Sequence, residues 1–223
     1  MALAQVDPRP KRTRSDGERS RQAILRGATE LATIEGLEGI SLGALASHIG
    51  MSKSGLYAHF GSKQELQLAT IDAAEEIFDR EVTQPGLAAG GPLDQILGLS
   101  NAFLSYVERR VFPGGCFFAA AAAEFDAREG GPVRGRIQEF HAEWLAMVVD
   151  LIREAQARDE IAAEADPKQI AFEIDSVMLG ANAAFLLFAD SEALERARRA
   201  VCDRLGVRDP ESDGSVNRGR TGG

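Results

Sequence analysis

The stretch that most constrains the fold is residues 41–63, which read SLGALASHIGMSKSGLYAHFGSK. Its first half carries four apolar residues at the i, i+3, i+4, i+7 spacing that lines one face of a short helix. These residues are Leu42, Leu45, Ala46 and Ile49. Ser41 stands where an N-cap belongs, and Gly50 can end the helix in the left-handed conformation that glycine adopts without steric cost. The spacing therefore predicts a helix that a tight glycine turn ends.

A second helix is predicted over residues 53–59, with Ser52 as its N-cap. Leu56 and Phe60 would turn inward, whereas the polar side chains would face outward. The outward residues are Lys53, Ser54, Gly55, Tyr57 and His59. Two helices joined by a tight glycine turn, the second with a polar outer face, are typical of a helix-turn-helix. The alternative is an ordinary helical hairpin inside a bundle.

The residue that begins the next predicted helix, Lys63, adds a second indication. A cation at a helix N-terminus works against the helix macrodipole, so we expect an anionic partner such as a phosphate there. With these features, the chain resembles the TetR family of bacterial transcription regulators. The matching residues are Ser41, Leu45, Ala46, Ile49, Gly50, Ser52, Leu56, Tyr57, His59, Phe60, Lys63 and Leu66. The resemblance is close over about residues 19–71 and looser beyond.

The resemblance implies an all-α fold of about nine helices: an N-terminal three-helix helix-turn-helix head that binds DNA, and a C-terminal helical bundle that binds an effector and dimerises. The sequence is divided accordingly into a mobile basic arm (1–17), the head (18–63), the effector-binding and dimerisation domain (64–206) and a disordered tail (207–223). Apolar periodicity and Pro/Gly breakers predict further helices at 18–35, 63–82, 92–112, 116–125, 133–157, 167–188 and 191–205.

The charge distribution supports this division. The net charge of the chain is −9, but residues 8–63 carry nine Lys or Arg against five Asp or Glu, a local net of +4. Residues 64–223 therefore carry −12. A basic module joined to an acidic one fits a DNA-binding head on a body that DNA repels. The basic residues of the arm can reach DNA, or they can simply be solvated.

The major groove admits one α-helix, so the outward residues of the second helix are the candidate readers of bases. Lys53 can donate to guanine, Ser54 can bond a base edge or a phosphate, and Gly55 lets the backbone approach closely. Tyr57, Lys63 and Ser41 are candidate phosphate anchors, and His59 and Ser52 complete the predicted site. Tyr57 could instead be a half-buried ring between helices.

The predicted helix at 167–188 is apolar on nearly all sides, so it needs cover on two faces. The core of one protomer covers one face, and a second copy can cover the other together with the last helix, which is how the resembled family dimerises. The expected partners are a homodimeric copy, a double-stranded DNA operator and a small hydrophobic effector, with no membrane, cofactor or metal.

An effector pocket is expected in the body, where aromatic and soft side chains come with a few polar ones. The candidate lining residues are Phe103, Tyr106, Cys116, Phe117, Phe118, Trp144, Phe172, Asp175, Met178 and Asn182. For any one of them, plain core packing is the alternative.

Two other functions are weighed against DNA binding. Cys116 and His141 could form a nucleophile–base pair, but no hydrolase, phosphate-binding or dinucleotide motif accompanies them. The other is a partner-binding protein with a vestigial head.

Two cysteines are too few for a disulfide framework, and neither a secretory signal nor a membrane-length apolar run is recognised. We therefore expect a cytoplasmic protein that is not an enzyme.

Overall fold

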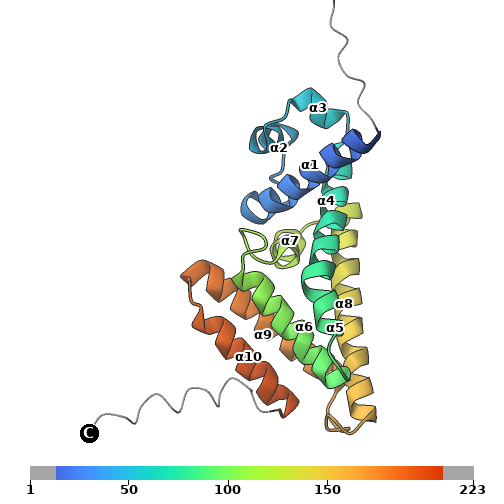
Figure 1. The fold of residues 1–223 in the computed structure, drawn as a ribbon, viewed down its shortest axis with the longest axis vertical. Coiled ribbons are helices and arrows are strands. Elements are labelled where there is room, and N and C mark those ends of the chain that lie inside the picture. Colours follow the sequence, from blue (N-terminus) through green and yellow to red (C-terminus); the bar gives the residue numbers. More distant parts are fainter. Residues whose placement is uncertain (1–13, 208–223) are drawn as a thin grey trace, which may run out of the picture.

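The computed structural model describes residues 14–207, and within this range every regular element is helical (Figure 1). The segments are α1 (Arg14–Glu35), α2 (Leu42–Ile49), α3 (Lys53–Tyr57), α4 (Lys63–Phe78), η1 (Asp79–Thr83), α5 (Gln84–Leu87), α6 (Pro92–Glu108), α7 (Phe117–Phe125), α8 (Pro132–Ala157), α9 (Pro167–Phe188) and α10 (Glu192–Leu205). Because α4, η1 and α5 follow one another without a break, they form one long rod. The all-α prediction is confirmed.

The head consists of α1, α2 and α3, which lie together at one end of the molecule (Figure 1). Ser41 caps α2, and Gly50 ends it with a φ of +69°. Ser52 caps α3 in turn, so the predicted helix-turn-helix is present with its predicted caps. Leu45, Leu56 and Phe60 are buried in the core that the three helices share.

Two boundaries in the head differ from the prediction. α1 begins at Arg14 rather than at residue 18, so residues 14–17 of the predicted arm are helical. The added turn contains Gly17, which costs about 1 kcal/mol relative to alanine in a helix, but it contains no proline that would remove a backbone donor. α3 ends at Tyr57 rather than at His59. The rest of the predicted arm, residues 1–13, and residues 208–223 of the predicted tail lie outside the described part of the chain.

The rod that leaves the head also runs further than predicted. We expected it to end near Val82, ahead of Pro85, but it continues to Leu87 through the π-helical segment η1. Proline lacks an N–H and clashes with the carbonyl four residues back in an α-helix. In η1 the N–H of Gln84 bonds to the carbonyl of Asp79, five residues back, and this wider turn lets the rod pass the proline.

The helix α6 ends at Glu108, four residues before the predicted end. Arg110 follows with a φ of +50°, and the chain turns so that Phe112 is buried. The Phe112 ring packs edge-on against the Tyr106 ring, with centroids 6.0 Å apart, and in a tilted arrangement against the Phe117 ring at 6.2 Å. The gain from burying this ring explains why the helix stops early.

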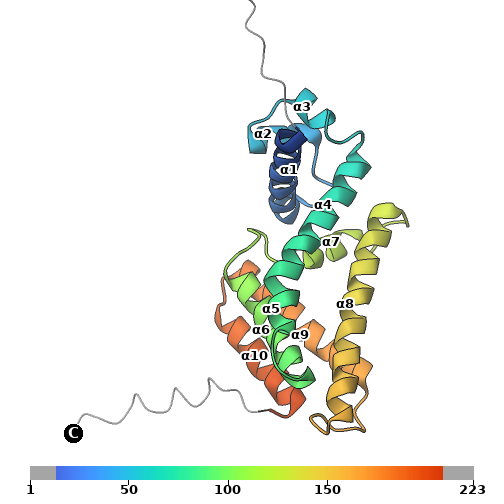
Figure 2. The ribbon, with the colours of Figure 1, turned by 45° about the vertical axis from the view of Figure 1, so that its right-hand side comes forward.

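The body is built from α6, α8, α9 and α10 around the long α4 rod, with α7 at the junction to the head (Figure 2). An aromatic cluster fills its core. The cluster residues are Phe78, Phe103, Tyr106, Phe118, Phe140 and Trp144. Phe78 of α4 is at its centre, since its ring contacts rings from α6, α7 and α8. The helix that leaves the head is thus held by the core of the body.

The helix α9 is apolar on two faces, as predicted. Its inner face is buried through residues such as Ile170, Ile174 and Met178, whereas Phe172, Leu187 and Phe188 are 64%, 75% and 73% exposed. By length and mean hydropathy α9 also resembles a membrane span, contrary to our expectation that no run is long enough. One of its apolar faces packs on α6, α8 and α10, as in the core helix of a helical bundle, and the other is exposed in the single chain.

Candidate DNA-binding and effector sites

The outer face of α3 carries the predicted readers together. Lys53 and Ser54 are exposed, Gly55 is half-buried, and the Tyr57 side chain is 58% exposed. Leu56, on the opposite side of α3, is fully buried. The structure therefore places the Tyr57 ring outward rather than between helices, and α3 presents one polar face to solvent.

Three serines cap the helices that surround this face. The hydroxyl of Ser41 accepts the N–H of Ala44 at 3.0 Å, and that of Ser52 accepts the N–H of Gly55 at 3.2 Å. The Ser41 hydroxyl keeps its own proton to donate to a phosphate, whereas the Ser52 hydroxyl also shares a hydrogen bond with the Ser54 hydroxyl at 3.2 Å. Sequence reasoning missed the third cap, Ser62, whose hydroxyl accepts the N–H of Glu65 at 3.1 Å. The Ser-x-x-Glu spacing of these two residues was the available signal.

The anion that Lys63 was expected to need lies inside the chain. Lys63 Nζ donates to Glu38 Oε1 at 2.7 Å and to the Glu38 carbonyl at 2.6 Å. Gln67 also donates to the Glu38 carboxylate, and hydrogen bonds from both side chains lower the pKa of that carboxyl. Glu38 therefore supplies an anion for Lys63 within the chain, and the contact of Lys63 with a phosphate stays a prediction. Lys63 remains part-exposed beside α3.

His59 lies half-buried at the edge of the face, where its carbonyl accepts a hydrogen bond from Arg21 Nη1 at 3.2 Å. The Arg21 guanidinium also covers the Phe60 ring, 4.6 Å from its centroid. Sequence reasoning missed Arg21, since its partners lie 38 and 39 residues further along the chain. Arg21 and His59 join α1 to the end of the helix-turn-helix, and they fix the angle at which α3 is presented.

Six of the ten predicted pocket residues line one small internal cavity of about 20 Å³ in the body. They are Phe103, Cys116, Phe118, Trp144, Asp175 and Met178. Tyr106, Phe117 and Asn182 are buried but do not line this cavity. Phe172 is a correction, because it lies on the outer face of α9 and borders a surface groove with α8. The apolar periodicity of α9 cannot show which of its two faces meets the core.

Buried polar groups sit beside this cavity. Burial raises the pKa of the Cys116 thiol to about 11, so a neutral thiol is present at pH 7. His141 Nε2 contacts the Phe118 carbonyl at 3.3 Å rather than the thiol. The N–H of Cys116 donates to Asn182 Oδ1 at 3.0 Å, so Asn182 positions the start of α7. These contacts are those of a buried residue that packs at the start of α7.

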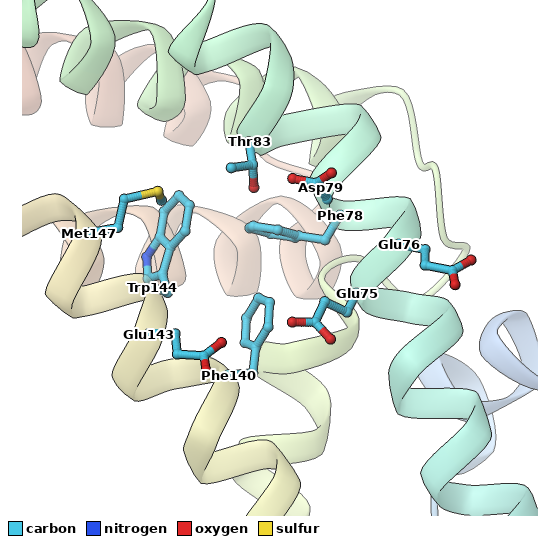
Figure 3. Close-up of a pocket in the computed structure, with 9 residues that line it drawn as sticks. All are labelled: Glu75, Glu76, Phe78, Asp79, Thr83, Phe140, Glu143, Trp144 and Met147. Atoms are coloured by element: carbon cyan, nitrogen blue, oxygen red, sulfur yellow. The ribbon is translucent and has the colours of Figure 1, made fainter.

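A larger pocket of about 380 Å³ opens between the α4 rod and α8 (Figure 3). Its lining residues are Glu75, Glu76, Phe78, Asp79, Thr83, Phe140, Glu143, Trp144 and Met147. Phe78, Phe140 and Trp144 also line the small cavity, so these three rings form the wall between the two spaces. Only Trp144 of this set was predicted. Helical spacing predicts Phe78, Phe140 and either Met147 or Val148 inward, but spacing does not locate an opening between two helices.

The head contacts the body through α7. Glu124 accepts the backbone N–H of Leu37 at 2.7 Å and that of Glu38 at 3.0 Å, both in the loop between α1 and α2. The N–H of Gly114 donates to Thr33 Oγ1 at 3.1 Å, and a Cβ at Gly114 would lie 1.9 Å from the Thr33 carbonyl oxygen. The same α7 carries Phe118, whose ring stacks on Phe140 at 3.3 Å. One short helix therefore touches both the head loop and the pocket wall.

Two family models match the chain. The model described as "Bacterial regulatory proteins, tetR family" matches residues 24–70, and "Tetracyclin repressor-like, C-terminal domain" matches residues 92–201. The first contains α2 and α3 with the turn between them, and the second contains α6 to most of α10. The matches thus cover both the head and the body.

Curated relatives are also transcription regulators. The chain is 25% identical over 171 residues to the transcriptional regulator AcuR of Cereibacter sphaeroides, covering 74% of this chain and 78% of AcuR. It is 25% identical over 151 residues to the HTH-type transcriptional regulator LmrA of Bacillus subtilis, covering 66% of this chain and 78% of LmrA.

Among solved structures, a TetR transcriptional regulator from Chloroflexus aurantiacus is similar, with a TM-score of 0.79 and 27% identity, covering 86% of this chain and 96% of that chain. The fold is also that of AibR in complex with isovaleryl coenzyme A and operator DNA, with a TM-score of 0.63 and 20% identity over 80% of this chain and 96% of AibR. Regulators of this family are generally not enzymes. With a capped helix-turn-helix, matches across head and body, and relatives that are regulators, the chain belongs to the TetR family and is a DNA-binding transcriptional regulator.

Proposed function

We propose that this regulator is a homodimeric repressor that an effector bound in the body releases from a near-palindromic operator. The observation that carries the proposal is the polar outer face of α3 on a buried, doubly capped helix-turn-helix. The working division is a head of residues 18–63 and a body of residues 64–206, although α1 already begins at Arg14. We place the protein in the cytoplasm, where bacterial DNA is.

At the operator, α3 would lie in the major groove. Lys53 would donate to guanine O6 or N7, Ser54 would bond a base edge or a phosphate, and Gly55 would let a thymine methyl group approach the backbone. Tyr57, Ser41 and Lys63 would contact phosphates, with the N–H groups at the capped helix starts assisting. Lys63 can serve only by sharing its ammonium group with Glu38.

Dimerisation would use the outer face of α9 together with α10. Phe172, Leu187 and Phe188 expose large apolar surfaces there, and such surfaces are stabilised when a second copy covers them. A two-fold dimer of this kind presents two reading helices about 34–36 Å apart, one turn of B-DNA. A near-palindromic operator follows from that symmetry.

A conformational change in the body would reach the head through α7 and release the DNA. An effector that binds better to one arrangement of α7 and the α4 rod shifts the population toward that arrangement. Glu124 holds the α1–α2 loop, and Phe118 stacks on the pocket wall, so a shift of α7 changes the placement of the head. Two heads with altered spacing fit one operator less well.

The test begins with a duplex selected from a random pool by repeated binding to the protein, so that no operator has to be guessed. Fluorescence anisotropy then compares this duplex with a scrambled one over a series of salt concentrations. Specific binding should weaken linearly in log salt, as expected when Lys and Arg neutralise phosphates. If no sequence is enriched, the proposed operator recognition is wrong.

The role of α3 is tested with Lys53→Ala, which should weaken binding to the selected duplex by about tenfold and to the scrambled duplex much less. Lys168→Ala removes the same charge from the start of α9 and serves as the matched control. Equal losses on both duplexes would assign Lys53 to phosphates alone. No loss would exclude α3 as the reading helix.

A further inference from the structure

The pocket between the α4 rod and α8 is lined by acidic and aromatic side chains. Four of its nine lining residues are carboxylates, namely Glu75, Glu76, Asp79 and Glu143, and none is Lys, Arg or His. Figure 3 shows Glu75 and Glu143 on either side of Phe140 with their carboxylates turned toward each other, while Glu76 points away. The opening of the pocket is therefore negatively charged.

These charges are compensated unequally. Glu75 is paired with Arg136, which lies outside the pocket lining, and Asp79 accepts a hydrogen bond from Gln84 Nε2 at 2.6 Å. Asp79 makes no ion pair within the described residues, and neither does Glu143, whose side chain is exposed. The two carboxylates come from different elements, η1 and α8, so they flank the opening from both sides.

The inner wall of the pocket is aromatic. Phe78 meets Phe140 and Trp144 edge to face, with centroid distances of 5.3 Å to both rings. Aromatic faces carry the negative part of the ring quadrupole, so they attract cations as the carboxylates do. Met147 adds a flexible thioether that can adapt to the shape of a ligand. A volume of about 380 Å³ is enough for a small organic molecule.

We propose that this pocket binds an organic cation that carries apolar or aromatic groups, with its charge near Glu143 and Asp79 and its apolar groups on Phe78, Phe140 and Trp144. The inference rests on the proposed function, since it names the chemical class of the effector. An anionic ligand such as an acyl-coenzyme A would bring further negative charge against these carboxylates. The position of Asp79 and Thr83 in η1 is consistent with a binding role, because π-turns are frequent at functional sites.

A matched pair of ions tests the sign of the charge directly. Tetraphenylphosphonium and tetraphenylborate have nearly the same shape and opposite charges, and triphenylphosphine oxide is a neutral counterpart. Trp144 is the only tryptophan of the chain and lines the pocket, so quenching of its fluorescence reports occupancy. We expect saturable quenching by the phosphonium ion at concentrations at least tenfold lower than by the borate ion. Equal or tighter binding of the borate ion, or no quenching by the phosphonium ion, would overturn the inference.

The site is then tested by substitution. Glu143→Gln should weaken phosphonium binding about threefold, as expected for a part-solvated ion pair, and Glu143→Lys should shift the preference toward the borate ion. Glu154→Gln removes the same charge from α8 three turns further on, outside the pocket, and should leave the affinity unchanged. Because Glu143 is exposed, these variants should fold normally. Equal affinities for all variants would remove Glu143 from the site.

Adding the selected operator duplex separates this inference from the proposed function. Phosphonium binding with no loss of operator affinity would leave the cation site in place and contradict effector-driven release. If triphenylphosphine oxide released the operator as effectively as the phosphonium ion, release would stand and the proposed cation preference would be wrong.

Discussion

At the scale of single residues, Asp175 is a carboxyl group whose environment opposes its charge. Burial raises its pKa above the ordinary value of 3.8, while a hydrogen bond from Trp144 Nε1 at 3.2 Å and the nearby His141 act in the opposite direction. A carboxyl with a raised folded-state pKa lowers the free energy of unfolding as the pH rises from the ordinary pKa through the raised one. The native charge at Asp175 therefore costs stability at neutral pH.

We predict that Asp175→Asn raises the melting temperature at pH 7, because the amide oxygen can still accept from Trp144 and no charge is buried. The difference from the wild type should narrow as the pH falls through the raised pKa toward 3.8, because Asp175 in the folded protein becomes protonated within that window. Thermal unfolding over a pH series measures the difference in melting temperature, and Asp150→Asn on the exposed surface of α8 is the control. A gain that is independent of pH, or a loss at pH 7, would contradict this account of Asp175.

The side-chain directions in the head could be predicted from sequence, whereas long-range partners could not. Helical spacing placed Leu56 and Phe60 inward and Tyr57 outward, because these directions depend on neighbours within two turns. The partner of Lys63 lies 25 residues away in Glu38, so the loop between α1 and α2 had to be placed first. For the same reason, the sequence could not show that Phe172 lies outside the pocket.

At the scale of elements, the rod formed by α4, η1 and α5 meets α6 at two glycines. A Cβ at Gly86 would lie 2.7 Å from the Leu99 Cα, and a Cβ at Gly98 would lie 2.6 Å from the Gly86 carbonyl oxygen. Both contacts involve backbone, which cannot yield as a side chain can. The close approach of α5 to α6 therefore requires glycine at both positions.

Gly86→Ala should accordingly lower the free energy of unfolding by about 2 kcal/mol, because the added methyl group forces the helices apart. Chemical denaturation measures the loss. Gly135→Ala is the matched control, since a Cβ there meets nothing within 4 Å and α8 should gain up to about 1 kcal/mol. A neutral Gly86→Ala variant would mean that α5 and α6 are not this close.

Apolar periodicity and Pro/Gly breakers predicted that the helices exist, but they did not predict several of the residues at which the helices begin or end. The predicted start of α9 at residue 167 is confirmed, because a helix cap is a local interaction: the Asp166 side chain accepts the N–H of Lys168 at 3.0 Å. Pro85 led us to expect that the rod ends before it, but the π-turn of η1 carries the helix past the proline. Phe112 was expected at the end of α6, but its ring packs instead against Tyr106 and Phe117. A wider local turn decided the first of these ends, and tertiary packing decided the second.

At the scale of the whole molecule, the exposed apolar face of α9 predicts the oligomeric state. Leu187→Asp should convert the dimer to a monomer, because a charge cannot be buried against a second apolar face. Operator affinity should then fall by roughly a hundredfold or more, since each head binds alone. Sedimentation measures the mass. Tyr57→Asp is the control, since it places the same charge at an exposed apolar side chain of the head and should leave a dimer that binds DNA poorly.

The dimeric regulator is tested by the stoichiometry of its complex with the selected operator, measured by sedimentation of labelled duplex titrated with protein. We expect two protomers to bind together on each duplex, and we expect Leu187→Asp to lose that complex. If one protomer bound each duplex as tightly as the two do together, the dimeric regulator would be wrong, because the outer face of α9 would have no part in presenting two reading helices to one operator.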